Sequence, residues 1–145
     1  MTHLHLPLPF PPSVEAAGKH THHLQHCQAA PIDYLAHDGS EIRLLPENKY
    51  GGIAHCTLPP EKTSKAVKHK TVEEIWYILE GKGKMWRKKG SNETVIDLKP
   101  NLSLTIPTGT NFQFINTGST PLKIIIATMP PWPGAEEAEP VEGCW

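Results

Sequence analysis

The sequence predicts an all-β fold, an antiparallel β-barrel or jelly roll, on three observations. Short runs of β-branched and aromatic residues follow one another from Tyr34 to Met129, separated by turn-forming residues. Residues 102–106 alternate strictly between apolar and polar, which is the period of a half-buried strand. Sustained helical periodicity is nearly absent. We therefore expect short antiparallel strands joined by hairpins.

Nine segments have the composition of strands. They are residues 41–45, 52–58, 64–69, 74–79, 84–88, 94–98, 103–106, 112–115 and 122–128. Between them lie groups rich in Gly, Asn, Ser and Pro, which supply the positive or fixed φ of tight turns. These groups are residues 81–83, 90–92, 107–109 and 116–118.

The chain of 145 residues is short enough for one hydrophobic core. Residues 1–31 are rich in His and Pro and lack periodicity, so we expect an irregular N-terminal arm. Residues 32–130 form the predicted barrel. Residues 131–145 form a proline-rich and acidic C-terminal strap, which we expect to be exposed because its prolines cannot donate ladder hydrogen bonds.

Charge and composition argue against several classes of partner. Fourteen Lys and Arg residues balance fifteen Asp and Glu, a net charge of −1, so no basic surface for nucleic acid or membrane is expected. The longest apolar run, residues 124–127, is far too short to span a bilayer. The N-terminus lacks the features of a secretion signal, and the three separated cysteines do not suggest disulfides. These features together predict a cytoplasmic protein.

Two segments, residues 66–81 and 106–116, carry patterned polar residues around turn signals. Together and in this order they resemble the paired motifs of the cupin superfamily, and the resemblance covers roughly residues 50–128. It implies that the barrel is of the cupin type, with its functional site in the interior.

The first motif of metal-binding cupins has a His-x-His pair, then a Glu, then six residues and a Gly. Glu74 and Gly81 match the end of this pattern. With four residues before the Glu, the second His position is His69 but the first is Val67. In the alternative alignment both positions fall on lysines, Lys68 and Lys70, so the pair is broken in either case.

The second motif has Pro-x-Gly, two residues, a His, three residues and an Asn. Pro107, Gly109 and Asn116 fit this pattern, while Phe112 stands at the His position. By this resemblance, two of the four usual ligands are present, His69 and Glu74. Asn and Gln would be weaker replacements for the missing histidines, because they offer only a neutral amide oxygen.

Our leading hypothesis is therefore an enzyme-like cupin that acts on a small molecule. His69 and Glu74, with His55 as a third candidate, would hold a divalent metal such as Fe, Mn, Zn or Ni. Glu73, Asn111 and Gln113 are further candidates for recruitment. The resemblance implies dioxygenase, decarboxylase, isomerase or lyase chemistry, and fold alone does not select among them. Without a metal, Glu74 is a candidate general base.

The alternative hypothesis is a metal-free module that binds a sugar-like or aromatic metabolite. Loss of two ligand histidines motivates it. Its candidate pocket comprises Trp76, Tyr77, Trp86, Phe112, Gln113 and Phe114, although aromatic residues on strands are first of all core material. A third hypothesis is a structural role, in which aromatic side chains simply fill the barrel.

We also expect a homodimer, because small cupins commonly pair and free sheet edges invite pairing.

Overall fold

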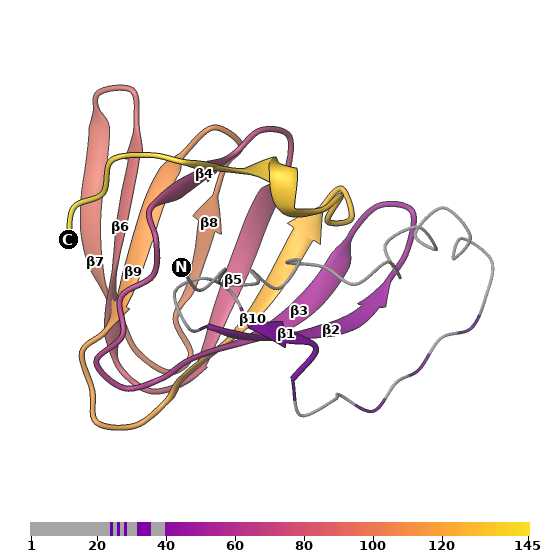
Figure 1. Ribbon diagram of the computed structural model, residues 1–145, viewed down its shortest axis with the longest axis horizontal. Coiled ribbons are helices and arrows are strands. Elements are labelled where there is room, and N and C mark those ends of the chain that lie inside the picture. The colour runs from indigo at the N-terminus through magenta and orange to yellow at the C-terminus, as the bar shows by residue number, and fades with distance from the viewer. Residues whose placement is uncertain (1–23, 25, 27, 29–31, 36–39) are drawn as a thin grey trace, which may run out of the picture.

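The computed structural model describes residues 24, 26, 28, 32–35 and 40–145, in which strands predominate (Figure 1). All nine expected strands are present, and most differ from the expected bounds by one or two residues at an end. The N-terminal arm expected over residues 1–31 lies outside the described residues, apart from three positions. The strands are β1 (Tyr34–Leu35), β2 (Glu41–Glu47), β3 (Gly52–Leu58), β4 (Val67–His69), β5 (Glu73–Glu80), β6 (Gly83–Lys89), β7 (Asn92–Leu98), β8 (Ser103–Ile106), β9 (Asn111–Asn116), β10 (Leu122–Met129) and β11 (Ala138–Pro140).

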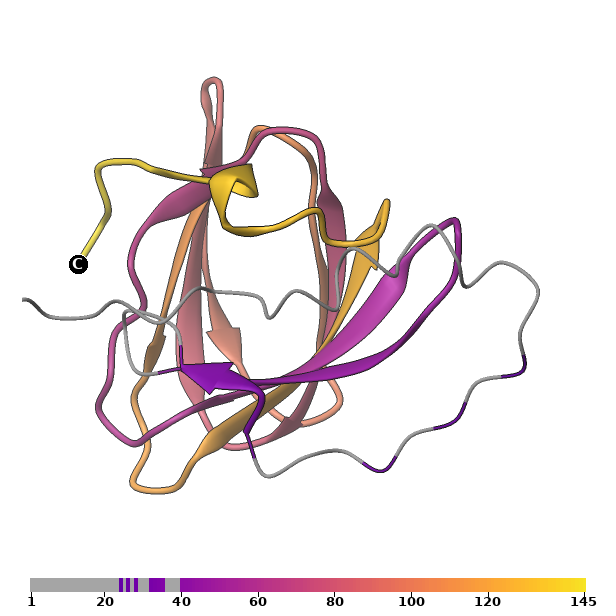
Figure 2. The same ribbon diagram turned by 45° about the vertical axis from the view of Figure 1, so that its right-hand side comes forward.

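The strands form two antiparallel sheets that face each other (Figures 1 and 2). One sheet has the order β1-β2-β3-β10-β5-β8, and the other has the order β11-β4-β9-β6-β7. The described strands thus make a two-sheet jelly roll and not a closed hydrogen-bonded barrel. The predicted all-β class is confirmed.

The core lies between the sheets and follows from period-2 patterning. On β5 the side chains of Trp76 and Ile78 are buried, while those of Ile75 and Tyr77, which alternate with them, are exposed. The same alternation runs along β10 and β8. The buried cluster comprises Cys56, Leu58, Trp76, Ile78, Met85, Leu98, Leu104, Ile106, Phe112, Phe114, Leu122, Ile124 and Ile126.

Two motif residues have clear structural roles. Gly81 ends β5 with φ of 92°, and a Cβ there would lie 2.6 Å from the carbonyl oxygen of Pro121, so only glycine fits. The Asn116 amide donates to the carbonyl oxygens of Leu58 and Thr120, both at 2.9 Å. Its Oδ1 accepts from the Gly118 N–H at 2.8 Å. Asn116 therefore fixes the turn between β9 and β10.

The C-terminal strap differs from the exposed segment that we expected. It crosses one end of the two sheets (yellow in Figures 1 and 2), and its strand β11 pairs with β4. The connecting bonds avoid the proline nitrogens: Lys70 N–H donates to the Glu137 carbonyl at 3.1 Å, and Val141 N–H donates to the Ala66 carbonyl at 3.1 Å. The prolines did not prevent pairing because none stands at these donor positions.

Among the described residues, no helix is long and apolar enough to cross a membrane.

Candidate functional site

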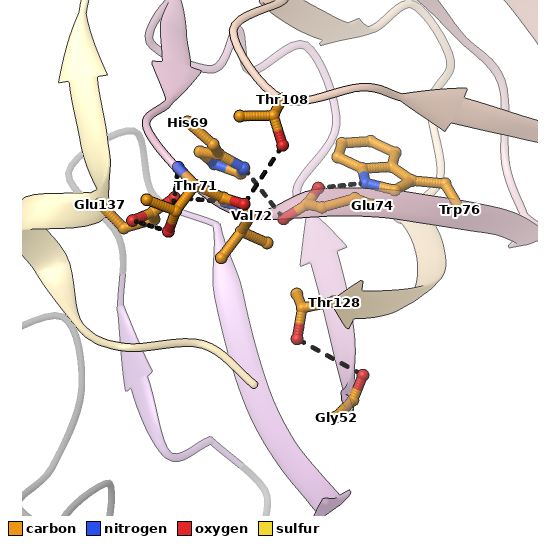
Figure 3. Close-up of polar contacts among 9 residues, drawn as sticks. All are labelled: Gly52, His69, Thr71, Val72, Glu74, Trp76, Thr108, Thr128 and Glu137. Carbon is orange, nitrogen blue, oxygen red and sulfur yellow. Dashed lines mark hydrogen bonds and ion pairs between the residues drawn. The ribbon is translucent and has the colours of Figure 1, made fainter. Parts of the chain in front are cut away.

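His69 and Glu74 lie side by side in the interior, at the end of the sheets that the strap crosses (Figure 3). His69 ends β4, and Glu74 is the second residue of β5. Both are about 95% buried, with 5% of each residue exposed, and His69 Nδ1 is 3.5 Å from Glu74 Oε1. The two surviving motif positions are therefore adjacent in space.

The second motif supports His69 through the backbone. Residues 107–109 form a turn in which Thr110 N–H donates to the Pro107 carbonyl at 3.1 Å. Gly109 has φ of 77°, and its N–H donates to the His69 carbonyl at 3.0 Å. The Pro-x-Gly element thus fixes the backbone of His69, although the second motif supplies no histidine.

Glu74 is held in an environment that disfavours its charge. Its cross-strand neighbours are Ile106 on β8 and Thr128 on β10. Burial raises the pKa of Glu74 to about 7, and this is only partly opposed by the Trp76 indole N–H, which donates to Oε2 at 2.6 Å. Near neutral pH the Glu74 carboxyl therefore exists in both protonation states.

The His69 ring is enclosed by aromatic side chains. Its centroid is 5.2 Å from that of Phe112 and 4.8 Å from that of Trp132, both in edge arrangements. Burial lowers the pKa of His69 to about 4, against a smaller opposing effect of the Glu137 charge. His69 and Glu74 consequently do not form an ion pair near pH 6, where both are mainly neutral.

The Nδ1 atom of His69 has no hydrogen-bond partner in the part of the chain that the structure describes. Its 3.5 Å approach to Glu74 lacks hydrogen-bond geometry. The hydroxyl of Thr110, the residue that follows Gly109, is also buried and has no partner among the described residues. Such buried polar atoms normally bond to protein, water or ligand.

Glu137, in the short 3-10 helix η2 (Ala135–Glu137), binds the loop between His69 and Glu74. Its Oε1 accepts from Thr71 N–H at 2.5 Å and from Val72 N–H at 2.6 Å, and the Thr71 hydroxyl adds bonds of 2.9 and 3.0 Å (Figure 3). Burial opposes ionisation of Glu137, but these hydrogen bonds outweigh it and hold its pKa below the usual value.

The donor set does not fit a tightly held metal. Val67 and Phe112, at the two missing histidine positions, are direct cross-strand partners on β4 and β9, and both pack with the core. The described residues contain no group of three His, Cys, Asp or Glu side chains that would hold an ion. Catalytic metals in proteins usually have three protein ligands, whereas this site offers two, His69 and Glu74.

The structure does not bring the other candidate ligands to this pair. His55 lies on the outer face of the larger sheet, where its Nδ1 is 3.5 Å from Arg43 Nη1. Glu73 is exposed. On β9, Asn111 is half-buried, and the Gln113 side chain is committed to backbone groups of Ser64 and of the strap.

Of the six candidate pocket residues, three lie in the core between the sheets and three lie on outer sheet faces, where Trp86 and Gln113 are nevertheless buried and Tyr77 is exposed. Trp76, Phe112 and Phe114 belong to the core cluster, and the Trp76 ring contacts those of Phe112 at 6.0 Å and Phe114 at 5.0 Å. Three others lie outside that cluster.

Tyr77 is 43% exposed on the outer face, with its hydroxyl 2.8 Å from Asn101 Oδ1. Trp86 and Gln113 are cross-strand partners on the face of their sheet opposite to Met85 and Phe114. Strand alternation explains the division, because residues of opposite parity face opposite sides.

Trp132 and Glu137 are site residues that the sequence did not reveal. Trp132 stands among prolines and Glu137 within an acidic stretch, and neither composition indicates a buried contact. Only the return of the C-terminal segment to β4 brings them to His69.

Comparison with known proteins agrees with this architecture. A family model for the cupin domain matches residues 54–128. An uncharacterized protein of Methanocaldococcus jannaschii is 38% identical over 104 residues, which is 68% of this chain and 80% of that protein.

Solved structures are also similar. A predicted oxalate decarboxylase of Thermotoga maritima is 26% identical, with a TM-score of 0.55 over 63% of this chain and 80% of that one. The capsular polysaccharide assembling protein CapF of Staphylococcus aureus is 16% identical, with a TM-score of 0.65 over 79% of this chain and 32% of that one. The likeness to CapF concerns the fold alone, whereas the cupin family match and the likeness to the Thermotoga protein support an enzyme-like or ligand-binding role. On its sequence match and its two-sheet jelly roll, the chain belongs to the cupin family.

Proposed function

We propose that this cupin binds a small organic ligand without a metal, and that Glu74 exchanges a proton with the ligand. The observation that carries the proposal is the buried pair itself. Glu74 Oε1 faces the Nδ1 atom of His69, which has no hydrogen-bond partner among the described residues, at 3.5 Å within an aromatic enclosure.

The chemistry of the pair favours a ligand that carries a hydroxyl or carbonyl group. Two polar atoms 3.5 Å apart can both bond to one ligand oxygen at ordinary hydrogen-bond distances. A carboxyl group with a pKa of about 7 can give or accept a proton at neutral pH, as a general acid or base must. The neutral imidazole of His69 can donate or accept according to its tautomer.

The rings around the pair favour a ligand with an apolar face. Trp132 and Phe112 flank His69, and aromatic side chains bind sugar rings and aromatic rings through their faces and edges. A sugar-like or phenolic ligand combines a ring with hydroxyl groups. We therefore place the ligand in this chemical class.

A metal-dependent enzyme is the second candidate, favoured by the closeness of His69 and Glu74 at matching motif positions. The name of the Thermotoga relative makes decarboxylation one reaction to test. Such a metal would need further ligands from the substrate or solvent, because the described residues provide only two.

The experiment compares binding by chelator-treated protein with binding after addition of Mn²⁺, Fe²⁺, Zn²⁺ or Ni²⁺. The probes are a panel of monosaccharides, uronic acids and hydroxybenzenes, measured by thermal shift and calorimetry, with oxalate added as a substrate. We expect the metal-free protein to bind a panel member, Glu74→Gln to weaken binding by about tenfold or more, and the exposed-site control Glu73→Gln to leave it unchanged.

Binding or turnover that appears only after a metal is added would contradict the proposal and support the second candidate. Absence of all binding, with and without metals, would support neither and would favour the reading of a filled interior.

A further inference from the structure

We propose that the C-terminal segment, residues 130–145, is a latched cover of the His69–Glu74 pair, and that Glu137 is the latch. This inference rests on the proposed function, because a cover has a role only if a ligand reaches the pair. In the closed arrangement both side chains are about 95% buried. A ligand must therefore displace part of what covers them.

The cover contacts the site through Trp132. The centroid of its ring lies 4.8 Å from that of the His69 ring, in an edge arrangement. The other ring against His69 is that of Phe112, which comes from β9. Phe112 belongs to a strand in the middle of its sheet and to the core cluster, whereas Trp132 stands in a segment without regular structure. Of the two rings against His69, Trp132 is the one that can move without disturbing the core.

The latch is the carboxylate of Glu137. It accepts hydrogen bonds from the backbone of Thr71 and Val72 and from the Thr71 hydroxyl, within the loop that joins His69 to Glu74 (Figure 3). These are bonds to a charged acceptor, which are stronger than neutral ones. Glu137 is 6% exposed, whereas its neighbours Ala135 and Glu136 in the same short helix are exposed. The Glu137 carboxylate, together with the bond from Lys70 N–H to the Glu137 carbonyl, thus fastens the otherwise exposed helix η2 to the site.

The segment has a hinge between its covering residue and its latch. Gly134 has φ of 136°, in the region that favours glycine, and no atom lies within 4 Å of its missing Cβ. Beyond the latch, β11 pairs with β4, and the Gln113 Oε1 atom accepts from the N–H groups of Cys144 and Trp145 at 2.9 and 3.0 Å. The end of the segment is therefore held independently of the latch.

The test measures how accessible His69 is in the full-length protein without any ligand. Diethyl pyrocarbonate acylates neutral, accessible imidazole, and mass spectrometry of peptides gives the rate for each histidine. Hydrogen exchange of the Thr71 and Val72 amides is followed in parallel. Glu137→Gln weakens the latch and keeps its shape.

The control is Glu139→Gln, in the same segment, whose carboxylate lies 3.5 Å from Lys68 and 3.9 Å from Lys70 at the surface.

We expect Glu137→Gln to raise the modification rate of His69 and the exchange rates of both amides by about tenfold, because the acceptor of these hydrogen bonds loses its charge. Trp132→Ala should raise the His69 rate without changing amide exchange. His55, on the outer sheet face, should react equally in all variants. Equal His69 rates in the wild type, Glu137→Gln and Glu139→Gln would overturn the inference.

The two proposals are distinguishable by their outcomes. If labelling shows that the cover opens but no probe binds, the proposed function is wrong and the cover stands. If a probe binds with the same association rate in the wild type, Glu137→Gln and Trp132→Ala, the proposed function stands and the cover is wrong.

Discussion

Glu74 and His69 have pKa values displaced in opposite directions by the same cause, which is burial in an apolar environment. The pKa of Glu74 rises from 4.5 to about 7, and that of His69 falls from 6.5 to about 4. Both shifts favour the uncharged form. The interior of this cupin therefore tolerates polar atoms at the pair but disfavours net charge there.

The two shifts have opposite effects on stability. Between about pH 4.5 and 7 the folded Glu74 keeps a proton that the unfolded chain has released, so its contribution to stability falls as the pH rises. Between about pH 4 and 6.5 the unfolded chain holds a proton that the folded His69 lacks, so this contribution rises with pH. The two effects oppose each other in the wild type.

Glu74→Gln removes only the falling contribution. We expect its free energy of unfolding, relative to the wild type, to increase by about 3 kcal/mol between pH 4.5 and 7. Urea denaturation across this range measures the difference, and Glu73→Gln serves as the control because Glu73 is exposed. Parallel curves for Glu74→Gln and the wild type would show that the Glu74 pKa is not raised.

Restoring the missing histidines should create a metal site. Val67 and Phe112 are cross-strand partners near His69 and Glu74, so Val67→His with Phe112→His would bring four donors together. We expect the double variant to bind one Zn²⁺ or Mn²⁺ with submicromolar affinity, and the wild type to bind at least about a hundredfold more weakly. Calorimetry measures both. Stoichiometric binding by the wild type would contradict our view of the donor set.

The sequence predicted two of the four residues that meet at the candidate site. His69 and Glu74 were predicted because they stand at ligand positions of the cupin-like first motif, whose spacing to Gly81 is local in the chain. Trp132 and Glu137 were not predicted, since Glu137 reaches Val72 across 65 positions and no local pattern encodes that contact. His55 was suggested by residue type alone, which does not specify the face of a strand.

Two of the turns that connect the strands contain a glycine with positive φ, Gly81 and Gly90. Gly81 connects β5 to β6, where a side chain would meet the backbone of Pro121 and Leu122. Gly90, between β6 and β7, also has positive φ, at 60°, but no atom lies within 4 Å of its missing Cβ. Substituting each glycine by alanine therefore distinguishes the destabilisation caused by steric overlap from that caused by the unfavourable φ.

We expect Gly81→Ala to destabilise the protein by about 3 kcal/mol or more, and Gly90→Ala by about 1 kcal/mol. The first substitution combines positive φ with a backbone overlap, while the second has only the unfavourable φ. Urea denaturation of both variants measures the difference. Equal destabilisation would mean that the chain around Pro121 relaxes to admit the methyl group.

Strand prediction succeeded where the chain itself carries the period. The alternation of Leu104 and Ile106 with polar residues gave β8 its observed bounds. The strand β11 was missed, because the sequence Ala-Glu-Pro has no alternation and becomes a strand only through pairing with β4. Tertiary context, not propensity, determines that element.

The whole molecule presents an apolar surface on the outside of its larger sheet, which we call the outer apolar face. Its residues are neighbours in register on β3, β10 and β5: Ile53, Ala127 and Ile75 in one row, and His55, Ile125 and Tyr77 in the next. Ile53, Ile75 and Tyr77 are 43–47% exposed. Ion pairs border the face, Arg43 with Glu41 and Lys123 with Glu80, so it carries little net charge.

We propose that a second copy of this chain covers the outer apolar face. Three strands over seven residues project roughly 330 Å², so the neighbouring strands β2 and β8 of the same sheet must join the contact for it to reach the roughly 500–800 Å² per partner of stable interfaces. A neutral apolar face meets no charge repulsion from its own copy. Neither a charged protein partner nor a nucleic acid would find complementary charge on this face.

Ile75→Glu with Tyr77→Glu should therefore convert a dimer to a monomer in sedimentation velocity at micromolar concentration. Val95→Glu is the control, because Val95 is 50% exposed on β7 of the other sheet and should leave the dimer intact. A wild type that is monomeric at about 100 μM would disprove this arrangement.

The pairing of β11 with β4 also protects a sheet edge. Without β11, the backbone groups of Val67–His69 on that side would be unpaired, and free edges recruit strands from other molecules. A segment that rose completely from the site would thus create an aggregation surface. The separate attachment of its end by Gln113 suggests how this cupin would admit a ligand and stay in solution: the portion around Trp132 moves while the edge strand remains in place.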